Sequence, residues 1–317
     1  MNKFKGTSKK GKVLITGGAG FIGSHVVDEL LEHHYEVIII DNLRTGSLAN
    51  LKDQIKLYQF DINDPNVELV FELENPDYVV HLAAQTSVIA SLDNPYLDFY
   101  TNTVGTVNMS LLSKKYNVKK FIFASTAAVY GEPSYLPLDE QHSVNPQSYY
   151  SLSKHSSENY VLLNGLLQGL DYCILRLSNV YGPRQNPHGE AGVVSIFINQ
   201  LMAGEEITIY DGSQTRDFVY VKDVARAFCK TLSTAQNGLF NISSCTETKI
   251  TDLFNLISKD LGLNSAPNFE SERVGEIKQS ILDNTKAQQV LEWSVRYPLN
   301  KGIKETIEHY SQLSRTV

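Results

Sequence analysis

Two kinds of apolar pattern alternate through the first half of the chain. Short runs rich in β-branched residues at 13–15, 36–40, 55–60, 78–82, 121–124 and 172–177 are typical of buried parallel strands. Between them, apolar residues recur every three or four positions at 21–31, at 67–73 and from 95 to 111, which predicts helices. Strands that alternate with helices predict an α/β fold built on a doubly wound parallel sheet, whose ligands bind at the carboxyl ends of the strands.

The pattern changes after residue 178. Helices are expected near 193–202, 221–232 and 250–261 and from residue 301, and strands at 207–210 and 239–242. These elements are shorter and more mixed, so we expect a smaller α/β lobe that is partly interleaved with the sheet and closes over a substrate. The chain is thus divided into a flexible tail at 1–11, a domain built on the parallel sheet at 12–178 and a second lobe at 179–317.

Three glycines join the first strand to the first helix. Gly17, Gly20 and Gly23 follow the apolar run, and Phe21 opens the helical pattern. A strand that turns on glycines into a helix presents backbone N–H groups and a positive helix end, which is a site for a pyrophosphate. We assign Gly17 to the tight turn, Gly20 to close approach of the phosphate and Gly23 to strand–helix packing. The G-x-x-G-x-x-G spacing differs from the usual dehydrogenase fingerprint, and alone it would indicate only a tight turn.

An acid at the end of the second strand makes the dinucleotide reading specific. Asp41 follows the run at 36–40, about 20 residues beyond the glycines. A carboxylate there accepts hydrogen bonds from a ribose diol and repels a 2′-phosphate, which favours NAD over NADP. Arg44 is the one nearby residue that would favour NADP.

Composition excludes several other classes of protein. A net charge of −7 over 317 residues argues against a nucleic-acid partner. Five lysines lie in the first twelve residues, but no apolar stretch accompanies them, so we expect neither a signal peptide nor a membrane span. Cys173, Cys229 and Cys245 show neither a disulfide pattern nor metal-ligand spacing. We therefore expect a cytoplasmic protein without a metal site.

Tyr150 and Lys154 form the candidate catalytic pair. They lie four residues apart in SYYSLSK and share one face of a helix. A tyrosine with an ordinary pKa near 10 is a poor base at neutral pH, but a neighbouring cation favours its phenolate. Such a phenolate can take a hydroxyl proton while a hydride leaves the adjacent carbon. On spacing alone the pair could equally be a surface contact, and Tyr149 should point away from Lys154.

Residues at the ends of two other strands should meet this pair. Ser125 and Thr126 end the fifth strand, where a hydroxyl could relay a proton to Tyr150 or simply close a turn. Ala83 follows the fourth strand, and a small residue there indicates backbone close to a ligand. His81, inside that strand, is expected to be hydrogen-bonded in place and not to act as a base.

These features together resemble the extended short-chain dehydrogenase/reductase family, and within it the UDP-hexose 4-epimerases. The resemblance covers nearly the whole chain from Lys12 onward. It implies a Rossmann fold, bound NAD, a UDP-sugar substrate and a homodimer formed through the helices after Pro95 and around Tyr150. The motifs that carry it are TGGAGFIG, Asp41, HLAAQ, ASTAAVYG, Tyr150 with Lys154, and RLSNVYGPRQ.

The resemblance assigns roles residue by residue. Tyr150 matches the catalytic base, Lys154 the lysine that binds the nicotinamide ribose, and Thr126 the catalytic hydroxyl, with Ser125 beside it. The cofactor-binding positions are Gly17, Gly20, Phe21, Ile22, Gly23, Asp41, Asn42, Asp61, Ile62, Leu82, Ala83, Ala84, Gln85, Asn102, Tyr150 and Lys154. The substrate-binding positions are Ser87, Thr126, Asn179, Val193, Val194, Tyr210, Arg216, Arg273, Glu276 and Ser280. One departure is Val274, where related proteins commonly carry proline.

The implied reaction is epimerisation at C4 of a UDP-hexose through a transient 4-keto sugar. A 4,6-dehydratase is disfavoured because such enzymes carry acids where Ala127 and Ala128 stand. A UDP-4-keto-sugar reductase and a 4-epimerase of a UDP-pentose or uronate stay open, and a non-catalytic NAD-binding scaffold is disfavoured by the intact catalytic residues. Ser280 aligns with a gate beside the sugar, where a small residue is expected to admit the 2-acetamido group of UDP-GlcNAc and UDP-GalNAc; otherwise it is a solvent-facing serine.

Overall fold

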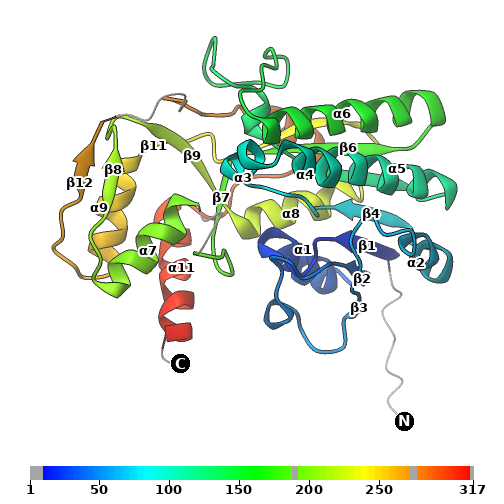
Figure 1. Cartoon of the computed structure of the whole chain (residues 1–317), viewed down its shortest axis with the longest axis horizontal. Coiled ribbons are helices and arrows are strands. Elements are labelled where there is room, and N and C mark those ends of the chain that lie inside the picture. The colour runs from blue at the N-terminus through cyan, green and yellow to red at the C-terminus, as the bar shows by residue number, and fades with distance from the viewer. Residues whose placement is uncertain (1–9, 188–191, 272–276, 315–317) are drawn as a thin grey trace.

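A seven-stranded parallel sheet forms the centre of the protein (Figure 1). The computed structural model describes residues 10–187, 192–271 and 277–314, so most of the expected N-terminal tail lies outside the described residues. The strand order is β10-β6-β5-β4-β1-β2-β3, and every neighbouring pair is parallel. The strands are β1 (Lys12–Thr16), β2 (Glu36–Ile40), β3 (Lys56–Tyr58), β4 (Tyr78–His81), β5 (Lys120–Thr126), β6 (Tyr172–Leu177) and β10 (Gly238–Ile242). The predicted doubly wound α/β fold is confirmed.

Helices cover both faces of this sheet. Side chains alternate along β1, so that Val13 and Ile15 enter one core while Leu14 enters the other. The first core is closed by α1 (Phe21–Glu32) and α8 (Val221–Thr231), which contribute Val26 and Phe228. The second core is closed by α2 (Val67–Glu74), α5 (Gly105–Lys115) and α6 (Tyr149–Gln168). Both faces are thus buried, which explains why the strands read as continuous apolar runs.

The helix expected from residue 95 to 111 is interrupted. The structure has α4 (Pro95–Phe99), a π-helical turn at Tyr100–Val104, and then α5. Asn102 lies in that turn and its side chain bonds the main chain of Gln85, a contact that apolar periodicity does not encode. A further short helix, α3 (Val88–Asp93), was not predicted, because six residues are too few to show a helical period.

The second lobe has its own small sheets and core. β7 (Asn179–Tyr181), β9 (Thr215–Tyr220) and β11 (Glu247–Lys249) form one sheet, and β8 (Thr208–Tyr210) pairs with β12 (Asn268–Glu270). Three helices, α7 (Val193–Ala203), α9 (Ile250–Asp260) and α11 (Leu299–Ser314), pack against them around a separate apolar cluster. In Figure 1 this lobe lies beside the carboxyl end of the large sheet.

The chain passes between the lobes more than once. After β9 it returns to the large sheet, where α8 packs on α1 and β10 pairs with β6. It then enters the small lobe again and comes back through residues 277–284 to α10 (Thr285–Leu291). Leu138 N donates to Ile281 O at 2.8 Å and Asp283 N donates to Leu138 O at 2.8 Å, so this segment runs along the loop that follows β5. No helix among residues 10–187, 192–271 and 277–314 combines the length and the apolar character that a bilayer crossing needs.

Candidate active site

The turn between β1 and α1 has the geometry of a phosphate cradle. Gly17 has a φ of +72°, and a Cβ there would lie 2.7 Å from Ala83 N. A Cβ on Gly23 would lie 2.0 Å from Gly17 O, so the helix start packs directly on the turn. Gly20 is the N-cap of α1 and supplies no side-chain cap. The first turn of α1 therefore presents backbone N–H groups to an anion, as the pyrophosphate of a dinucleotide requires.

Asp41 stands opposite this turn at the end of β2. Its carboxylate is buried and accepts hydrogen bonds from Ala19 N at 2.9 Å and Leu43 N at 2.8 Å. Each carboxylate oxygen has a second lone pair, so these bonds fix the group and leave it able to accept from a ribose diol. Beside it, Asn42 Nδ2 donates to Asp61 Oδ2 at 2.9 Å. These residues of the structure fit the adenosine side of NAD.

His81 is held under the glycine turn. Its Nδ1 lies 2.6 Å from Thr16 Oγ1 and its Nε2 lies 3.1 Å from Thr106 Oγ1. Burial, assisted by the positive charge of Lys154, lowers the pKa of His81 to about 3. Thr16 Oγ1 also accepts from Leu82 N and Ala83 N, so Thr16 and His81 together order the segment after β4, and His81 is hydrogen-bonded in place, as expected.

Asn102 clamps the same segment from the helix side. Its Oδ1 accepts from Gln85 N at 2.8 Å and its Nδ2 donates to Gln85 O at 2.9 Å. The side-chain amide of Gln85 in turn donates to Ser87 O and to Asp98 Oδ1. Ser87 Oγ accepts from Ala90 N at 2.7 Å and caps α3. The HLAAQ segment is thus fixed in one conformation beside the cofactor turn.

Tyr150 and Lys154 lie on the first turns of α6. Ser148 and Ser151 form a capping box, which sets the start of the helix at Tyr149. Tyr149 is 48% exposed and points outward, whereas Lys154 is only 4% exposed. Lys154 Nζ lies 4.2 Å from the centroid of the Phe123 ring.

The environment of Lys154 favours the uncharged form of its side chain. Burial lowers the pKa of Lys154 to about 7, and the carboxylates of Glu158 and Asp98 oppose that shift. Losing a proton near neutrality is unusual for a lysine, whose ordinary pKa is near 10.4. A buried lysine with a pKa lowered this far, at the carboxyl end of a parallel sheet, marks a candidate catalytic site.

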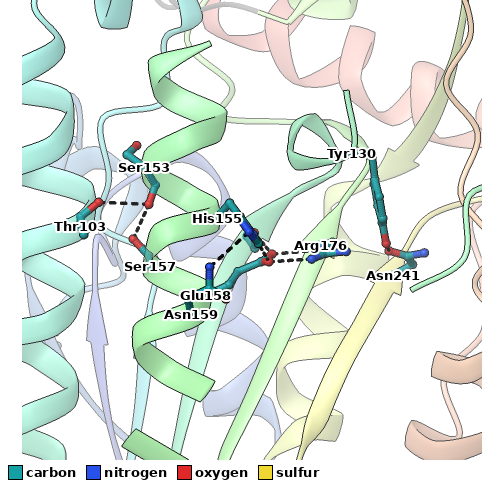
Figure 2. Close-up of polar contacts among 10 residues, drawn as sticks. Thr103, Tyr130, Ser153, His155, Ser157, Glu158, Asn159, Arg176 and Asn241 are labelled. Atoms are coloured by element: carbon teal, nitrogen blue, oxygen red, sulfur yellow. Dashed lines mark hydrogen bonds and ion pairs between the residues drawn. The ribbon is translucent and has the colours of Figure 1, made fainter. Parts of the chain in front are cut away.

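The two hydroxyls at the end of β5 face different surroundings. Thr126 Oγ1 lies at the strand end and accepts from Ala128 N at 3.2 Å. Ser125 Oγ donates to Glu158 Oε1 at 2.5 Å, inside the domain. Successive strand residues point to opposite faces, so only one of the two can face a ligand above the strand end. Ser125 therefore contacts Glu158, whose buried ion pair with Arg176 is drawn in Figure 2.

The expected substrate residues lie on the second lobe. Asn179, Val193 and Val194 line one narrow hollow between β7 and the start of α7. Arg216, on β9, is partly buried and its Nη1 donates to Thr215 O at 2.8 Å. Tyr210 lies on β8, and Ser280 lies in the segment that returns to the large lobe. Arg273, Glu276 and the departure at Val274 fall outside the described residues.

Two features of the site were missed from the sequence. Glu158 and Arg176 form a buried bidentate ion pair behind β5, and Asp98 approaches Lys154 from α4. Glu158 stands four residues after Lys154, so the helical spacing that paired Tyr150 with Lys154 could have found it. Nothing in the sequence pairs Arg176 or Asp98 with that helix, because their contacts are tertiary.

A glycine cradle, an acid beside it and a tyrosine–lysine helix at the carboxyl end of a parallel sheet define a dinucleotide-binding enzyme of the Rossmann type. Residues 13–243 match the model of the NAD-dependent epimerase/dehydratase family, and the chain belongs to that family. NAD is accordingly its cofactor.

Named relatives resemble the chain over nearly its whole length. It is 44% identical to a putative UDP-glucose 4-epimerase of Methanocaldococcus jannaschii over 306 residues, which are 96% of this chain and 100% of the relative. A UDP-glucose 4-epimerase of Thermotoga maritima, solved with UDP-glucose, superposes with a TM-score of 0.93 at 43% identity and covers 96% of this chain and 99% of its own. A UDP-N-acetylglucosamine 4-epimerase of Methanobrevibacter ruminantium, solved with UDP-N-acetylmuramic acid, has a TM-score of 0.92 at 35% identity and covers 96% and 100%.

His81 makes the stability of the fold depend on pH. Its folded-state pKa of about 3 lies below the unfolded value of 6.5, so between these pH values the unfolded chain binds more protons. The free energy of unfolding therefore falls as the pH drops below 6.5, by about 1.4 kcal/mol per pH unit from this residue. We expect His81→Gln, which retains hydrogen-bonding atoms, to remove this dependence. In urea titrations at pH 7 and pH 5, the wild type should lose about 2 kcal/mol more than the variant.

The matched control is His34→Asn, because the His34 side chain is exposed and asparagine tolerates its φ of +67°. This control should lose as much stability between pH 7 and pH 5 as the wild type does. Equal losses in the wild type and His81→Gln would contradict the assignment of a neutral, buried His81.

Proposed function

We propose that the protein is an NAD-dependent 4-epimerase of UDP-hexoses that uses UDP-GlcNAc and UDP-GalNAc as well as UDP-Glc and UDP-Gal. The observation that carries the proposal is the buried Lys154 one helical turn from Tyr150, at the strand end that carries Thr126. The residues after Thr126 are Ala127 and Ala128, which offer no acid for elimination. The named epimerases that resemble the whole chain support the same reaction class.

Tyr150 would act as the base in this reaction. As a phenolate stabilised by the Lys154 ammonium, it takes the proton from the sugar O4, with Thr126 relaying it, and later returns it. NAD, which the β1–α1 turn and Asp41 would hold, would supply reversible hydride chemistry at C4 of the sugar. The chain therefore has to hold one proton near C4 for the lifetime of the ketone. The low dielectric around Lys154 strengthens its attraction for the phenolate.

The two ends of the substrate would be held differently. Arg216 is always charged and its forked guanidinium suits a diphosphate. Asn179, Val193 and Val194, which the resemblance assigns to the substrate, line one narrow hollow. A nucleotide end held by more contacts than the sugar end would allow the flat keto sugar to turn over between hydride transfers.

The size of Ser280 and one relative support use of N-acetylated sugars. Ser280 is small and partly buried, and the two residues before it line a hollow with residues 132–136. The relative solved with UDP-N-acetylmuramic acid is itself named a UDP-N-acetylglucosamine 4-epimerase. We therefore assign Ser280 as the residue that decides whether a 2-acetamido group enters.

We further propose a homodimer in the cytoplasm. Large apolar side chains stay exposed along the helices of one face, α3 to α6, which lie together in Figure 1. On α6 alone, Leu166 is 79% and Leu167 74% exposed. Exposed apolar patches of this extent mark interaction surfaces, and a second copy would offer the same helices across a two-fold axis. The three cysteines carry free thiols, as suits a reducing compartment.

Replacement of Tyr150 by phenylalanine tests the chemistry. The protein should purify with NAD(H) that is released only on denaturation, and NMR should show C4 epimers of UDP-Glc formed without added cofactor. Tyr150→Phe should keep the dinucleotide and lose at least about a hundredfold in kcat. Stoichiometric consumption of added NAD(P)H would favour a reductase instead, and unchanged turnover in the variant would refute the role of Tyr150.

Substitution of Ser280 tests the substrate range. Ser280→Tyr should suppress epimerisation of UDP-GlcNAc by at least about tenfold in kcat/KM, because a bulky side chain competes with the acetamido group, and should spare UDP-Glc. Ser280→Ala is the control and should retain both activities. Equal losses on both substrates in Ser280→Tyr would argue against a gate.

Charge introduced on α6 tests the dimer. Leu166→Glu with Leu167→Glu should convert the dimer into a monomer in sedimentation velocity, because two carboxylates would be desolvated in the contact. Leu313→Glu on α11, where the side chain is 52% exposed, should leave the dimer intact. A wild-type monomer at micromolar concentration would refute the proposal.

A further inference from the structure

A third residue continues the catalytic stripe of α6. Tyr150, Lys154 and Glu158 follow one another at intervals of four, so they share one helix face. Burial deepens along the stripe: Tyr150 is partly buried, Lys154 is 4% exposed and Glu158 is 1% exposed. The reaction proposed above uses the first two residues and gives Glu158 no part.

The Glu158 carboxylate joins three elements of the fold. Its Oε1 accepts from Arg176 Nε at 2.9 Å and from Ser125 Oγ at 2.5 Å, and its Oε2 accepts from Arg176 Nη2 at 2.7 Å. His155 Nδ1 lies 3.3 Å from Oε2 on the same helix (Figure 2). One side chain of α6 thereby fixes the end of β5, where Thr126 follows Ser125, and the end of β6, where Arg176 lies.

The far side of this ion pair is braced as well. The Arg176 guanidinium lies 4.6 Å from the centroid of the Tyr130 ring, and Tyr130 Oη donates to Asn241 Oδ1 at 2.7 Å, as Figure 2 shows. A buried ion pair is a poor stabiliser, since apolar residues of similar volume often stabilise a core as well or better. Fold stability therefore does not explain why this ion pair lies next to Tyr150 and Lys154.

The charges around Lys154 explain the position of the ion pair. The charged and titratable groups that face Lys154 are Tyr150 and Glu158 on its own helix, Asp98 on α4 and His81 on β4. His81 is neutral near pH 7, because burial lowers its pKa to about 3. Of the two carboxylates, Glu158 opposes the loss of the Lys154 proton more strongly than Asp98 does. Glu158 therefore favours the charged form of Lys154 against the burial that disfavours it.

We propose that Glu158 is a positioning residue: paired with Arg176, it keeps Lys154 charged beside Tyr150 and holds the Ser125–Thr126 strand end in register with that pair. Burial raises the pKa of Glu158, but the hydrogen bonds and charge of Arg176, together with the hydrogen bonds of His155 and Ser125, outweigh it and hold that pKa below its usual range, so the carboxylate stays ionised. The inference rests on the proposed function in taking Tyr150 and Lys154 as the base and its cation.

Glu158→Gln tests the electrostatic part directly. Glutamine has nearly the same shape and still accepts from Ser125, but it carries no charge. In the holoenzyme labelled with ¹³C-lysine, the one lysine that titrates near neutrality is assigned to Lys154 by its loss in Lys154→Met. We expect its midpoint to fall by about one pH unit in Glu158→Gln, the size of shift that a neighbouring opposite charge produces. The alkaline limb of the pH–kcat profile should move by the same amount, while the NAD content stays unchanged.

Glu74→Gln is the matched control. Glu74 is another buried glutamate, 5% exposed, that pairs with Lys12 and Lys56 on the far side of the domain. A loss of ion pairing that affects only stability should lower the melting temperature of this variant and leave the lysine titration and pH profile at their wild-type positions. An unmoved Lys154 titration in folded, NAD-loaded Glu158→Gln would overturn the proposal.

The lysine titration does not depend on which sugar is turned over, so failure of the epimerase assay and failure of this inference are distinguishable. If Glu158→Gln does not fold, Ser125→Ala keeps both charges and almost all the core volume. We expect it to retain NAD and lower kcat severalfold with little change in KM, because Thr126 loses its register. An unchanged kcat in Ser125→Ala would refute the part of the proposal that concerns the strand end.

Discussion

The desolvation of one ammonium group constrains the whole active site. Lys154 lies in the interior, above the ring of Phe123, where a charge is costly unless partners surround it. Those partners come from α6 and α4, and the sheet below provides the aromatic face. Because the same low dielectric strengthens every remaining interaction, a single cation would suffice to stabilise the Tyr150 phenolate in the proposed reaction. The packing of α6 on the sheet would then be part of that chemistry.

The sequence was most informative where local pattern and chemistry coincide. The apolar run of β2 is continuous because both faces of this strand are buried, and α1 shows a helical period because only one of its faces is buried. Both elements have the expected bounds within a residue or two. The glycine turn was predictable because Gly17 and Gly23 sit where any Cβ would strike the main chain. The pairing of Tyr150 with Lys154 needed only the helix repeat.

Long-range contacts account for what the sequence did not reveal. β7 and β9 are short strands whose partners lie far apart in the chain, so neither shows a clear period. β10 was expected as a strand, but its place beside β6 in the large sheet depends on a crossover that no residue pattern encodes. Likewise, the two hydroxyls at the end of β5 read alike in the sequence. Only the packing of α6 shows that Ser125 faces a buried carboxylate.

The route of the chain between the lobes has a consequence for the history and the engineering of such a protein. The strands of the large sheet come from two separate stretches, 12–177 and 238–242, and the second follows a visit to the small lobe. No contiguous fragment of the chain therefore contains the whole of one lobe without part of the other. A new specificity therefore cannot be gained by exchanging a terminal domain, a route that is open to enzymes made of consecutive, independently folded domains. Substrate specificity has to change instead through substitutions within loops, while the interleaved lobes keep their structure.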